Sequence, residues 1–486
     1  MSKRVLFITP PYHCGVVESG GKWQNLGFLY IAEELRKEGH QVEVYDAMAK
    51  GHTYQDIEEK IEEVKPDIVG SNAYTATLQA ATRILQIAKS IDPNITTIIG
   101  GIHPTMMPEE TLQKAEGAID FVIRWEGEYT TPELLKALEG KMNLSEVRGI
   151  AYLDGDELVL TAQQEYIQDL DSLSPAWDLV DWEDYYVCYF PHERVAMVSS
   201  SRGCSFECTF CSQQKFWQRN WRARSPENFV GEIETLHRKY GVTAFSIIDE
   251  YPTKDRERWE GILDLLVEKD LGVHFLLETR AQDILRDRDI LYKYRKAGII
   301  HMFIGLEATS QDALDTLKKS ETCEEGREAI QLLNEQNIIT EGSFIVGFPD
   351  ETEESIHNTL KLSRYYNVDH VIFLLVTPWP YSDIYENLSP YIEDFDYSNY
   401  NLVEPIVKPK SMSREELMDR VVKCYKSFYM RKLFQWLTVK DELKKKMLFR
   451  GFKAVMENSF LKKHMPKMGR MSEKAKKFLY MLGDLG

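Results

Sequence analysis

Three of the seven cysteines lie in one short stretch near the middle of the 486-residue chain. Cys204, Cys208 and Cys211 form a Cys-x3-Cys-x2-Cys pattern. A short loop with three thiolates can supply three ligands of an iron–sulfur cluster or of a zinc ion. Structural zinc requires a fourth protein ligand, and no Cys or His follows in the next two dozen residues. The spacing therefore favours a cluster with one iron open to a small molecule, with zinc or plain core thiols as alternatives.

The remaining cysteines stand singly and are expected to be core thiols: Cys14, Cys188, Cys323 and Cys424. The chain starts with a short apolar run that Pro10 and Pro11 end, which predicts a first strand and not a signal peptide or membrane span. We therefore expect no integral membrane segment, reduced cysteines and a cytoplasmic location. The hydrophobic content of 43% is typical of a globular protein, and the length predicts two or three cores.

Charge is distributed unevenly along the chain. The formal net charge is −18, yet residues 401–486 hold 21 Lys and Arg against 9 Asp and Glu, which is +12. Residues 1–400 therefore carry the remaining −30. An acidic body of this size argues against nucleic-acid binding. The basic C-terminal segment has a helical pattern, clearest over Tyr425–Trp436 and Leu443–Met456.

Residues 1–145 alternate short apolar runs with amphipathic segments, which is typical of a doubly wound parallel sheet of the Rossmann type. The expected strands are Arg4–Ile8, Gln41–Tyr45, Asp67–Gly70, Thr96–Ile99 and Asp120–Ile123. The expected helices include Leu26–Glu38, Gln55–Val64 and Ala80–Ser90. Ligands of such sheets bind beyond the carboxyl ends of the strands.

The loops at these strand ends are rich in glycine and in small hydroxyl residues. They include Ser71–Thr75, Gly100–Thr105 and Arg124–Glu128. Small residues let the backbone approach a large flat ligand closely. No Gly-x-Gly-x-x-Gly follows the first strand, so a dinucleotide is not favoured. A degenerate Rossmann domain with a purely structural role is the alternative.

A connector is expected over residues 146–192, with a hairpin at Gly149–Leu160. Over residues 193–400 strands and helices alternate again, which predicts a partial (β/α)6 barrel. Its expected strands are Val195–Ser199, Ala244–Asp249, His274–Glu278, His301–Leu306, Ile338–Val346 and His370–Val376. Residues 401–486 complete the chain as a basic helical domain. The predicted fold class is thus α/β, with a doubly wound domain, a partial barrel and a helical C-terminal segment.

Polar residues follow the barrel strands at the end where such barrels carry their chemistry. The cysteine loop follows the first strand. The motifs at the carboxyl ends of the other five strands are, in chain order, Asp249-Glu250, Glu278-Thr-Arg280, Gly305-Leu-Glu307, Gly347-Phe-Pro349 and Thr377–Tyr381.

The cysteine spacing and the order of these motifs resemble the radical S-adenosylmethionine (SAM) enzymes. In that family three cysteines hold a [4Fe-4S] cluster whose open iron binds SAM. The resemblance implies that Cys204, Cys208 and Cys211 are the cluster ligands. It implies SAM contacts from Phe210, Asp249, Glu250, Arg280, Glu307 and Gly347. For Arg280, an ion pair with Glu278 or Asp249 is the structural alternative.

The preceding domain resembles the cobalamin-binding domain of the B12-dependent radical SAM enzymes. The implied cobalamin contacts are Ser71, Asn72, Gly100, Gly101, His103, Glu126 and Gly127. The Asp-x-His-x-x-Gly motif, whose histidine ligates cobalt, is absent, since Pro11 and Val16 stand where its Asp and Gly are needed around His13. The resemblance therefore implies a cobalamin with no histidine on cobalt. For His13 and His103, loop histidines with no metal role are the alternative.

Several motifs together resemble the anaerobic magnesium-protoporphyrin IX monomethyl ester cyclase family over nearly the whole chain. They are Pro11–Gly15, Asp46–Met48, Gly100–His103, Cys204–Trp217 and Thr377–Pro380. The resemblance implies oxidative closure of the isocyclic ring of a magnesium porphyrin ester through a 5′-deoxyadenosyl radical, with oxygen from water. It implies a [4Fe-4S] cluster, SAM and cobalamin as cofactors, and an external electron donor such as flavodoxin or ferredoxin. It assigns no catalytic residue.

Alternatives stay open at this point. Related B12-dependent radical SAM enzymes are methyltransferases, some acting on tetrapyrroles, and the shared cofactor motifs do not separate the two reactions. A non-catalytic metal- or corrinoid-binding protein of the same fold is the alternative from another class. For the C-terminal segment we expect helices packed on the barrel with a solvated basic face. A lid over a large flat anionic substrate, or a membrane-surface contact, is the alternative.

Overall fold

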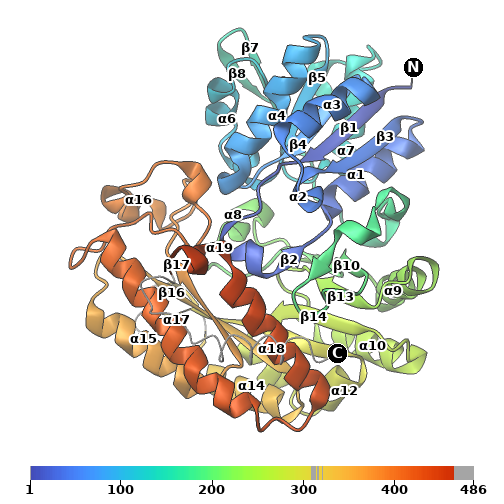
Figure 1. The fold of residues 1–486 in the computed structure, drawn as a ribbon. Coiled ribbons are helices and arrows are strands. Elements are labelled where there is room, and N and C mark those ends of the chain that lie inside the picture. Colours follow the sequence, from blue (N-terminus) through green and yellow to red (C-terminus); the bar gives the residue numbers. More distant parts are fainter. Residues whose placement is uncertain (1, 308–313, 315–316, 320, 465–486) are drawn as a thin grey trace.

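The structure is a computed structural model that describes residues 2–307, 314, 317–319 and 321–464. Its first domain is built on a seven-stranded sheet with the order β3-β1-β4-β5-β6-β7-β8 (Figure 1). The five parallel strands are β1 Arg4–Thr9, β3 Gln41–Asp46, β4 Ile68–Asn72, β5 Thr96–Gly100 and β6 Phe121–Ile123. The hairpin of β7 Ile150–Asp154 and β8 Glu157–Leu160 joins β6 in antiparallel pairing.

Helices cover both faces of this sheet, because its central strands are apolar on both sides. The helices are α1 Leu26–Lys37, α2 Ala47–Lys50, α3 Tyr54–Val64, α4 Leu78–Ile91, α5 Ile102–Met106, α6 Pro108–Lys114 and α7 Gly127–Leu138. α1 and α7 share one apolar core with Phe7, whereas α3 and α4 share another with Ile8 on the opposite face. Two layers of helix therefore enclose the sheet and leave only its strand ends open to a ligand.

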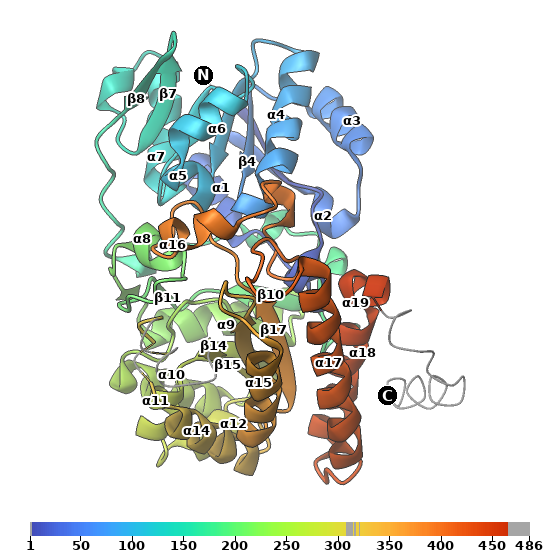
Figure 2. The ribbon, with the colours of Figure 1, turned by 90° about the vertical axis from the view of Figure 1, so that its left-hand side faces the viewer.

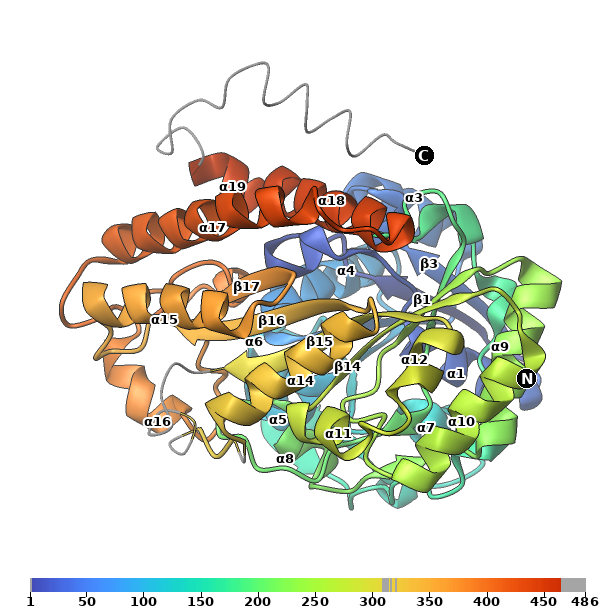
Figure 3. The same ribbon diagram turned by 90° about the horizontal axis from the view of Figure 1, so that it is seen from below.

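The second domain is a six-stranded parallel sheet in the sequential order β10-β13-β14-β15-β16-β17. Its strands are Val195–Val198, Ala244–Ile247, His274–Thr279, Ile299–Glu307, Ile339–Val346 and His370–Leu375. The helices outside it are α9 Pro226–Tyr240, α10 Arg256–Lys269, α11 Ala281–Arg286, α12 Leu291–Lys296, α14 Cys323–Glu335 and α15 Glu353–Tyr366, which Figure 3 shows from below. β10 and β17 are its two edges, so the predicted partial barrel is confirmed.

Four short strands and two short helices connect the larger elements. β2 Gly21–Lys22 pairs with β9 Tyr186–Val187, and β11 Ser201–Arg202 pairs with β12 Arg222–Ala223. α8 Gln213–Trp217 follows the cysteine loop, and α16 Tyr385–Leu388 follows β17.

The C-terminal helices α17 Arg414–Trp436, α18 Glu442–Glu457 and α19 Ser459–His464 run along the β17 edge of the barrel (Figures 1 and 2). The Tyr425 hydroxyl accepts a hydrogen bond of 2.9 Å from the backbone N–H of Phe373 on β17. At the far end, Asn458 Nδ2 donates to the carbonyl of Gly15 at 3.1 Å. The segment therefore covers an open barrel edge and reaches back to the first domain.

Every strand expected from the sequence is present, with its ends shifted by no more than two residues. The hairpin expected within the connector is present too, and it extends the first sheet through β6. The packing of helices on the barrel is as expected over residues 414–464, whereas residues 465–486 of the predicted basic domain lie outside the described residues. In the part of the chain that the structure describes, no helix has the length and apolar character needed to cross a membrane.

Candidate functional site

A cavity of about 920 Å³ lies between the two domains. Thr9, His13 and Asn72 line it from the carboxyl ends of β1 and β4. Glu250 and Glu278 line it from the carboxyl ends of β13 and β14. Both kinds of domain bind ligands at this end of their strands, so one space serves the two ligand edges.

The cysteine loop is anchored at its first turn. Gly203 has a φ of +88°, and a Cβ there would lie 2.0 Å from the carbonyl oxygen of Asn220, so only glycine fits. The Gly203 N–H donates to Glu250 Oε2 at 3.0 Å, and Trp217 Nε1 donates to Glu250 Oε1 at 2.7 Å. Glu250 thus joins the start of the loop to the helix that follows it.

Asp249 holds the residues just before the loop. It accepts hydrogen bonds from the Ser200 N–H at 2.8 Å and from the hydroxyls of Ser200 and Ser201 at 2.6 and 2.7 Å. Burial raises the pKa of both Asp249 and Glu250. Both were predicted SAM contacts; in the structure their carboxylates contact the cysteine loop, and Glu250 also lines the cavity.

The three cysteines fit a metal cluster. All three are free thiols, and they lie close enough that the charges of Cys204 and Cys208 act on Cys211. Burial raises the pKa of Cys211 to about 12, so its thiolate needs a nearby positive charge, which a metal centre supplies. Three thiols on one short loop are the donor set of an iron–sulfur cluster.

Two guanidinium nitrogens of Arg280 are buried without a hydrogen-bond partner. Its guanidinium stacks on the ring of Phe206 in the cysteine loop, 3.6 Å from the centroid, and its charge acts on Cys204. Nε and Nη2 have no hydrogen-bond partner. Arg280 forms no ion pair with Glu278 or Asp249 in the part of the chain that the structure describes. A buried, unpaired guanidinium beside the cluster loop fits the carboxylate of an amino-acid ligand such as SAM.

The other three predicted SAM residues lie around the same loop. Phe210 packs near Leu314 and Leu317. Glu307, at the end of β15, adopts a φ of +55° and lies 3.3 Å from Lys319 Nζ, so its charge is already paired. Gly347, with a φ of +93°, donates its N–H to Glu351 Oε2 at 2.9 Å.

Glu278 was not among the predicted contacts, although it occupies the centre of the site. Its side chain is exposed and lines the cavity, and it makes no hydrogen bond or ion pair with the described residues. Desolvation, followed by repulsion from Glu250, raises the pKa of Glu278 to about 8. At neutral pH this carboxyl is largely protonated and can donate a hydrogen bond into the cavity.

The predicted cobalamin residues form two groups. Asn72 lines the cavity, and its Oδ1 accepts from Asn25 Nδ2 at 2.9 Å. Ser71 lies beneath it and donates to the carbonyl of Ile8 at 2.9 Å. Gly100 and Gly101 are not among the residues that line the cavity; at Gly101, with a φ of +99°, a Cβ would lie 2.5 Å from the carbonyl oxygen of Ala73.

His103 is fully buried and does not reach the cavity. Its Nδ1 lies 3.0 Å from Thr75 Oγ1, which lies 3.1 Å from the hydroxyl of Tyr381 in the loop after β17. Burial lowers the pKa of His103 to about 4, so the ring is neutral. Through Thr75, His103 therefore links the first domain to the loop after β17. His13 does line the cavity, with Nε2 2.7 Å from the carbonyl oxygen of Gly21.

Glu126 belongs to a buried ion network between the two domains. Its oxygens each lie 2.7 Å from a guanidinium nitrogen, one of Arg202 and one of Arg222, and Arg202 also pairs with Glu128 at 2.7 Å. Gly127, between the two acids, packs where a Cβ would lie 2.7 Å from Ile31 Cδ1. Arg202 immediately precedes the cysteine loop, so the first domain's Trp-Glu-Gly-Glu loop fixes that loop's position.

A row of cavity-lining side chains inside the barrel has no signal in the sequence. Glu278, Phe303, Glu341 and His370 stand in register on four adjacent strands and all line the cavity. His301, two residues before Phe303, places Nε2 2.8 Å from Glu341 Oε2. Burial opposes the charge of Glu341, but the hydrogen bond and charge of His301 lower its pKa overall. Only the strand register brings these residues together.

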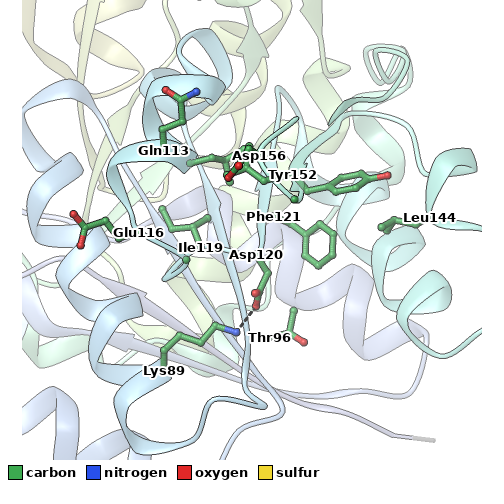
Figure 4. A pocket seen from close by; sticks show the side chains of 14 residues that line it. Lys89, Thr96, Gln113, Glu116, Ile119, Asp120, Phe121, Leu144, Tyr152 and Asp156 are labelled. Carbon is green, nitrogen blue, oxygen red and sulfur yellow. Dashed lines mark hydrogen bonds and ion pairs between the residues drawn. The ribbon is translucent and has the colours of Figure 1, made fainter. Parts of the chain in front are cut away.

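A second pocket, of about 780 Å³, lies at the amino ends of β5 and β6, away from both ligand edges (Figure 4). Its Lys89 Nζ pairs with Asp120 at 2.7 Å and also donates to the carbonyl of Ile95. Because these charges already satisfy each other, we do not assign it a function.

The comparisons with known proteins agree with this geometry. Residues 12–135 match the B12 binding domain family, and residues 198–363 match the radical SAM superfamily. The anaerobic magnesium-protoporphyrin IX monomethyl ester cyclase of Rubrivivax gelatinosus is 41% identical over 95% of this chain and 83% of its own length. The hopanoid C-3 methylase of Methylococcus capsulatus is 26% identical over 86% and 79%.

Solved structures share the whole architecture. The radical SAM methyltransferase TsrM of Kitasatospora setae, with cobalamin and a [4Fe-4S] cluster bound, superposes with a TM-score of 0.69 at 14% identity, covering 88% of this chain and 89% of its own. The cobalamin-dependent SAM radical enzyme OxsB, with aqua-cobalamin and SAM bound, gives 0.70 at 17% identity, covering 99% and 75%. The predicted fold and the predicted cofactor set, a [4Fe-4S] cluster, SAM and cobalamin, are confirmed.

The buried network yields a stability prediction. Glu126→Gln leaves Arg222 buried without its carboxylate, and we expect a loss of about 3 kcal/mol or more in the free energy of unfolding. Anaerobic urea denaturation measures it. Glu183→Gln is the matched control, because the Glu183–Arg194 pair is exposed and should contribute less than about 1 kcal/mol. Equal, small losses in both variants would contradict the role of the network.

The raised pKa of Glu278 predicts a pH dependence. A carboxyl whose pKa is higher in the folded than in the unfolded state stabilises the fold below its unfolded pKa, and this contribution is lost as the pH rises toward about 8. Glu278→Gln removes the titration. We therefore expect the wild type to lose stability relative to Glu278→Gln between about pH 5 and 8. Denaturation of both proteins across this range tests it, and parallel curves would refute it.

Proposed function

Because the chain belongs to the B12-dependent radical SAM enzymes, in the family of the anaerobic magnesium-protoporphyrin IX monomethyl ester cyclases, we propose that it closes the isocyclic ring of that ester by oxidation. The substrate is a tetrapyrrole, and the new oxygen comes from water. The observation that carries the proposal is the 41% identity to a cyclase over 95% of the chain, including the C-terminal helices. An external electron donor such as flavodoxin or ferredoxin completes the proposal.

In this proposal the barrel wall of the cavity binds the cluster and SAM, and the wall from the first domain binds cobalamin. When bound, the cluster with SAM supplies the radical that takes hydrogen from an unactivated carbon, and cobalamin supplies a second redox or methyl-carrying centre. Cys204, Cys208 and Cys211 would hold the cluster, and Arg280 would bind the SAM carboxylate. Asn72, which lines the cavity at the carboxyl end of β4, would face cobalamin. The protein itself orients the substrate between the two and keeps water out.

Methyl transfer to a tetrapyrrole or another unactivated carbon is the second candidate. It is supported by the 26% identity to the hopanoid C-3 methylase, which covers 86% of this chain and 79% of that relative. The cofactor residues serve both reactions, so they do not separate the candidates.

Product analysis distinguishes the two reactions. Magnesium-protoporphyrin monomethyl ester is incubated anaerobically with the reconstituted protein, methyl-labelled SAM, a reductant and ¹⁸O-water. The cyclase predicts a product that gains one oxygen from water, loses hydrogens and carries no methyl label. A labelled methyl group in the product would favour the methyltransferase, and no conversion with bound tetrapyrrole would refute the cyclase.

The cluster assignment is tested separately. Cys204→Ala, Cys208→Ala and Cys211→Ala should each lose cluster iron and sulfide after reconstitution, and form 5′-deoxyadenosine only at background level. Cys424→Ala is the control, because that thiol is buried in α17 and predicted to be a core residue. Iron content unchanged in all three loop variants would contradict the assignment.

A further inference from the structure

The outward side of helix α17 carries a row of apolar side chains that neither the cavity nor the proposed reaction uses. Met430, Phe434 and Leu437 are 49%, 70% and 43% exposed. Their spacing of four and three residues places them on one side of the helix, along about 10 Å of its length. Single exposed apolar residues are common on protein surfaces, whereas several in one row form a patch that is often an interaction site.

The helix cannot rotate to bury this row. Its inward side is already buried through Val421, Phe428 and Trp436, among others. The hydroxyl of Tyr425 also accepts a hydrogen bond of 2.9 Å from the backbone N–H of Phe373 on β17. Rotation would break this bond and expose larger apolar side chains than it would bury. The exposed row is therefore a fixed feature of the folded surface.

This part of the chain carries positive charge only. Residues 420–440 contain six Lys and Arg and no Asp or Glu, in a chain whose formal net charge is −18. Two of the six already have partners, since Arg420 pairs with Glu353 and Lys432 Nζ donates to Asn367 Oδ1 at 2.9 Å.

Three further cations stand around the apolar row. Lys423, Arg431 and Lys440 are exposed and form no ion pair with the described residues. Lys423 precedes Met430 by seven residues, which is two turns, so both lie on the same side of the helix. The side chains of Lys423, Met430, Arg431, Phe434, Leu437 and Lys440 together make what we call the outer face of α17. This face combines exposed apolar area with positive charge that the protein itself does not neutralise.

We propose that the outer face of α17 binds the surface of an anionic lipid bilayer. Met430, Phe434 and Leu437 enter the boundary between headgroups and acyl chains, and the cations around them meet lipid phosphates. Helices that lie in a membrane interface have this composition, with Phe and Leu on one side and Lys or Arg beside them. The contact is peripheral, because it uses one side of a helix whose other side is packed on the barrel.

Other anionic partners fit this face less well. A nucleic acid uses cations and aromatic rings, so it would leave the aliphatic side chains of Met430 and Leu437 in water. A stable complex with an acidic protein buries roughly 800 Å² on each partner, whereas this face is one helix wide. A bilayer has no such size requirement, since its affinity for the protein is the sum of a few inserted side chains and the attraction of nearby cations.

The location has a use under the proposed function, although the inference does not depend on that function. Tyr425, on the inward side of α17, lines the cavity. Figure 3 shows α17 and α18 as a layer outside the barrel. A bilayer on the outer face would therefore be separated from the cavity by one helix. A large apolar ester concentrates in lipid, so enzyme and substrate would meet at the same surface.

Phe395 provides a matched comparison for Phe434. It is 72% exposed, but Asp394 and Asp396 flank it in the sequence. An anionic surface repels such a site, whereas it attracts the surroundings of Phe434. The two phenylalanines thus have similar exposure and opposite electrostatic surroundings.

The test is flotation of the reconstituted full-length protein with lipid vesicles. One set of vesicles contains phosphatidylcholine alone, and the other contains phosphatidylcholine with phosphatidylglycerol. We expect binding to the anionic vesicles to be at least about tenfold stronger, and to weaken as added salt screens the cations. Equal binding to the two sets, or binding to neither, would overturn the inference.

Variants locate the contact on α17. Phe434→Ser removes the most exposed apolar side chain of the face and Arg431→Glu reverses a charge, so each should weaken binding to anionic vesicles by at least about tenfold. Phe395→Ser should leave vesicle binding unchanged. Circular dichroism and bound iron should be the same in all three variants, because these side chains are exposed and outside the cavity. Residues 465–486 also carry Lys and Arg and remain in every variant. Vesicle binding that stays unchanged in Phe434→Ser and Arg431→Glu would therefore overturn the assignment to α17.

Discussion

The structure depends on the buried ion network that joins the Trp-Glu-Gly-Glu loop of the first domain to the base of the cysteine loop. Four charges, those of Glu126, Glu128, Arg202 and Arg222, leave water together. Such a network is stable only while every charge keeps its partner, since an unpaired buried charge is strongly unfavourable. It therefore permits one relative placement of the two loops. Both cofactor edges face the same cavity because this placement is enforced at the point where they meet.

The carboxylates at the ends of the barrel strands show how the cysteine loop acquires a shape before any metal binds. Asp249 and Glu250 bind the N–H and hydroxyl groups of the residues around Gly203. Their burial disfavours the charged form, and these hydrogen bonds offset part of that penalty. A loop held in this way does not have to be ordered by its ligand. The conformational entropy of the loop is lost on folding, so less binding energy is spent on ordering it.

The sequence predicted the elements of the fold well and their long-range pairings poorly. Alternating apolar runs located every strand, and a motif after each barrel strand located the ligand edge. The same patterns could not reveal that Glu126 would pair with arginines 76 and 96 positions away, because periodicity says which face is buried and not what it meets. Likewise His301 and Glu341 look like ordinary strand residues. They become a pair only through the register of β15 and β16.

The polar groups of the cavity differ in whether they already have partners. On the inner face of the barrel, His301 Nε2 lies 2.8 Å from Glu341 Oε2, and the Tyr189 hydroxyl donates to the same oxygen at 3.4 Å, so these groups satisfy one another. At the strand ends, Glu278 lines the cavity and makes no hydrogen bond or ion pair among the described residues. A polar group taken from water without a partner is unfavourable, whereas a hydrogen-bonded one is not. The strand ends, where the ligand edges of the two domains meet, are therefore where a bound molecule gains polar partners.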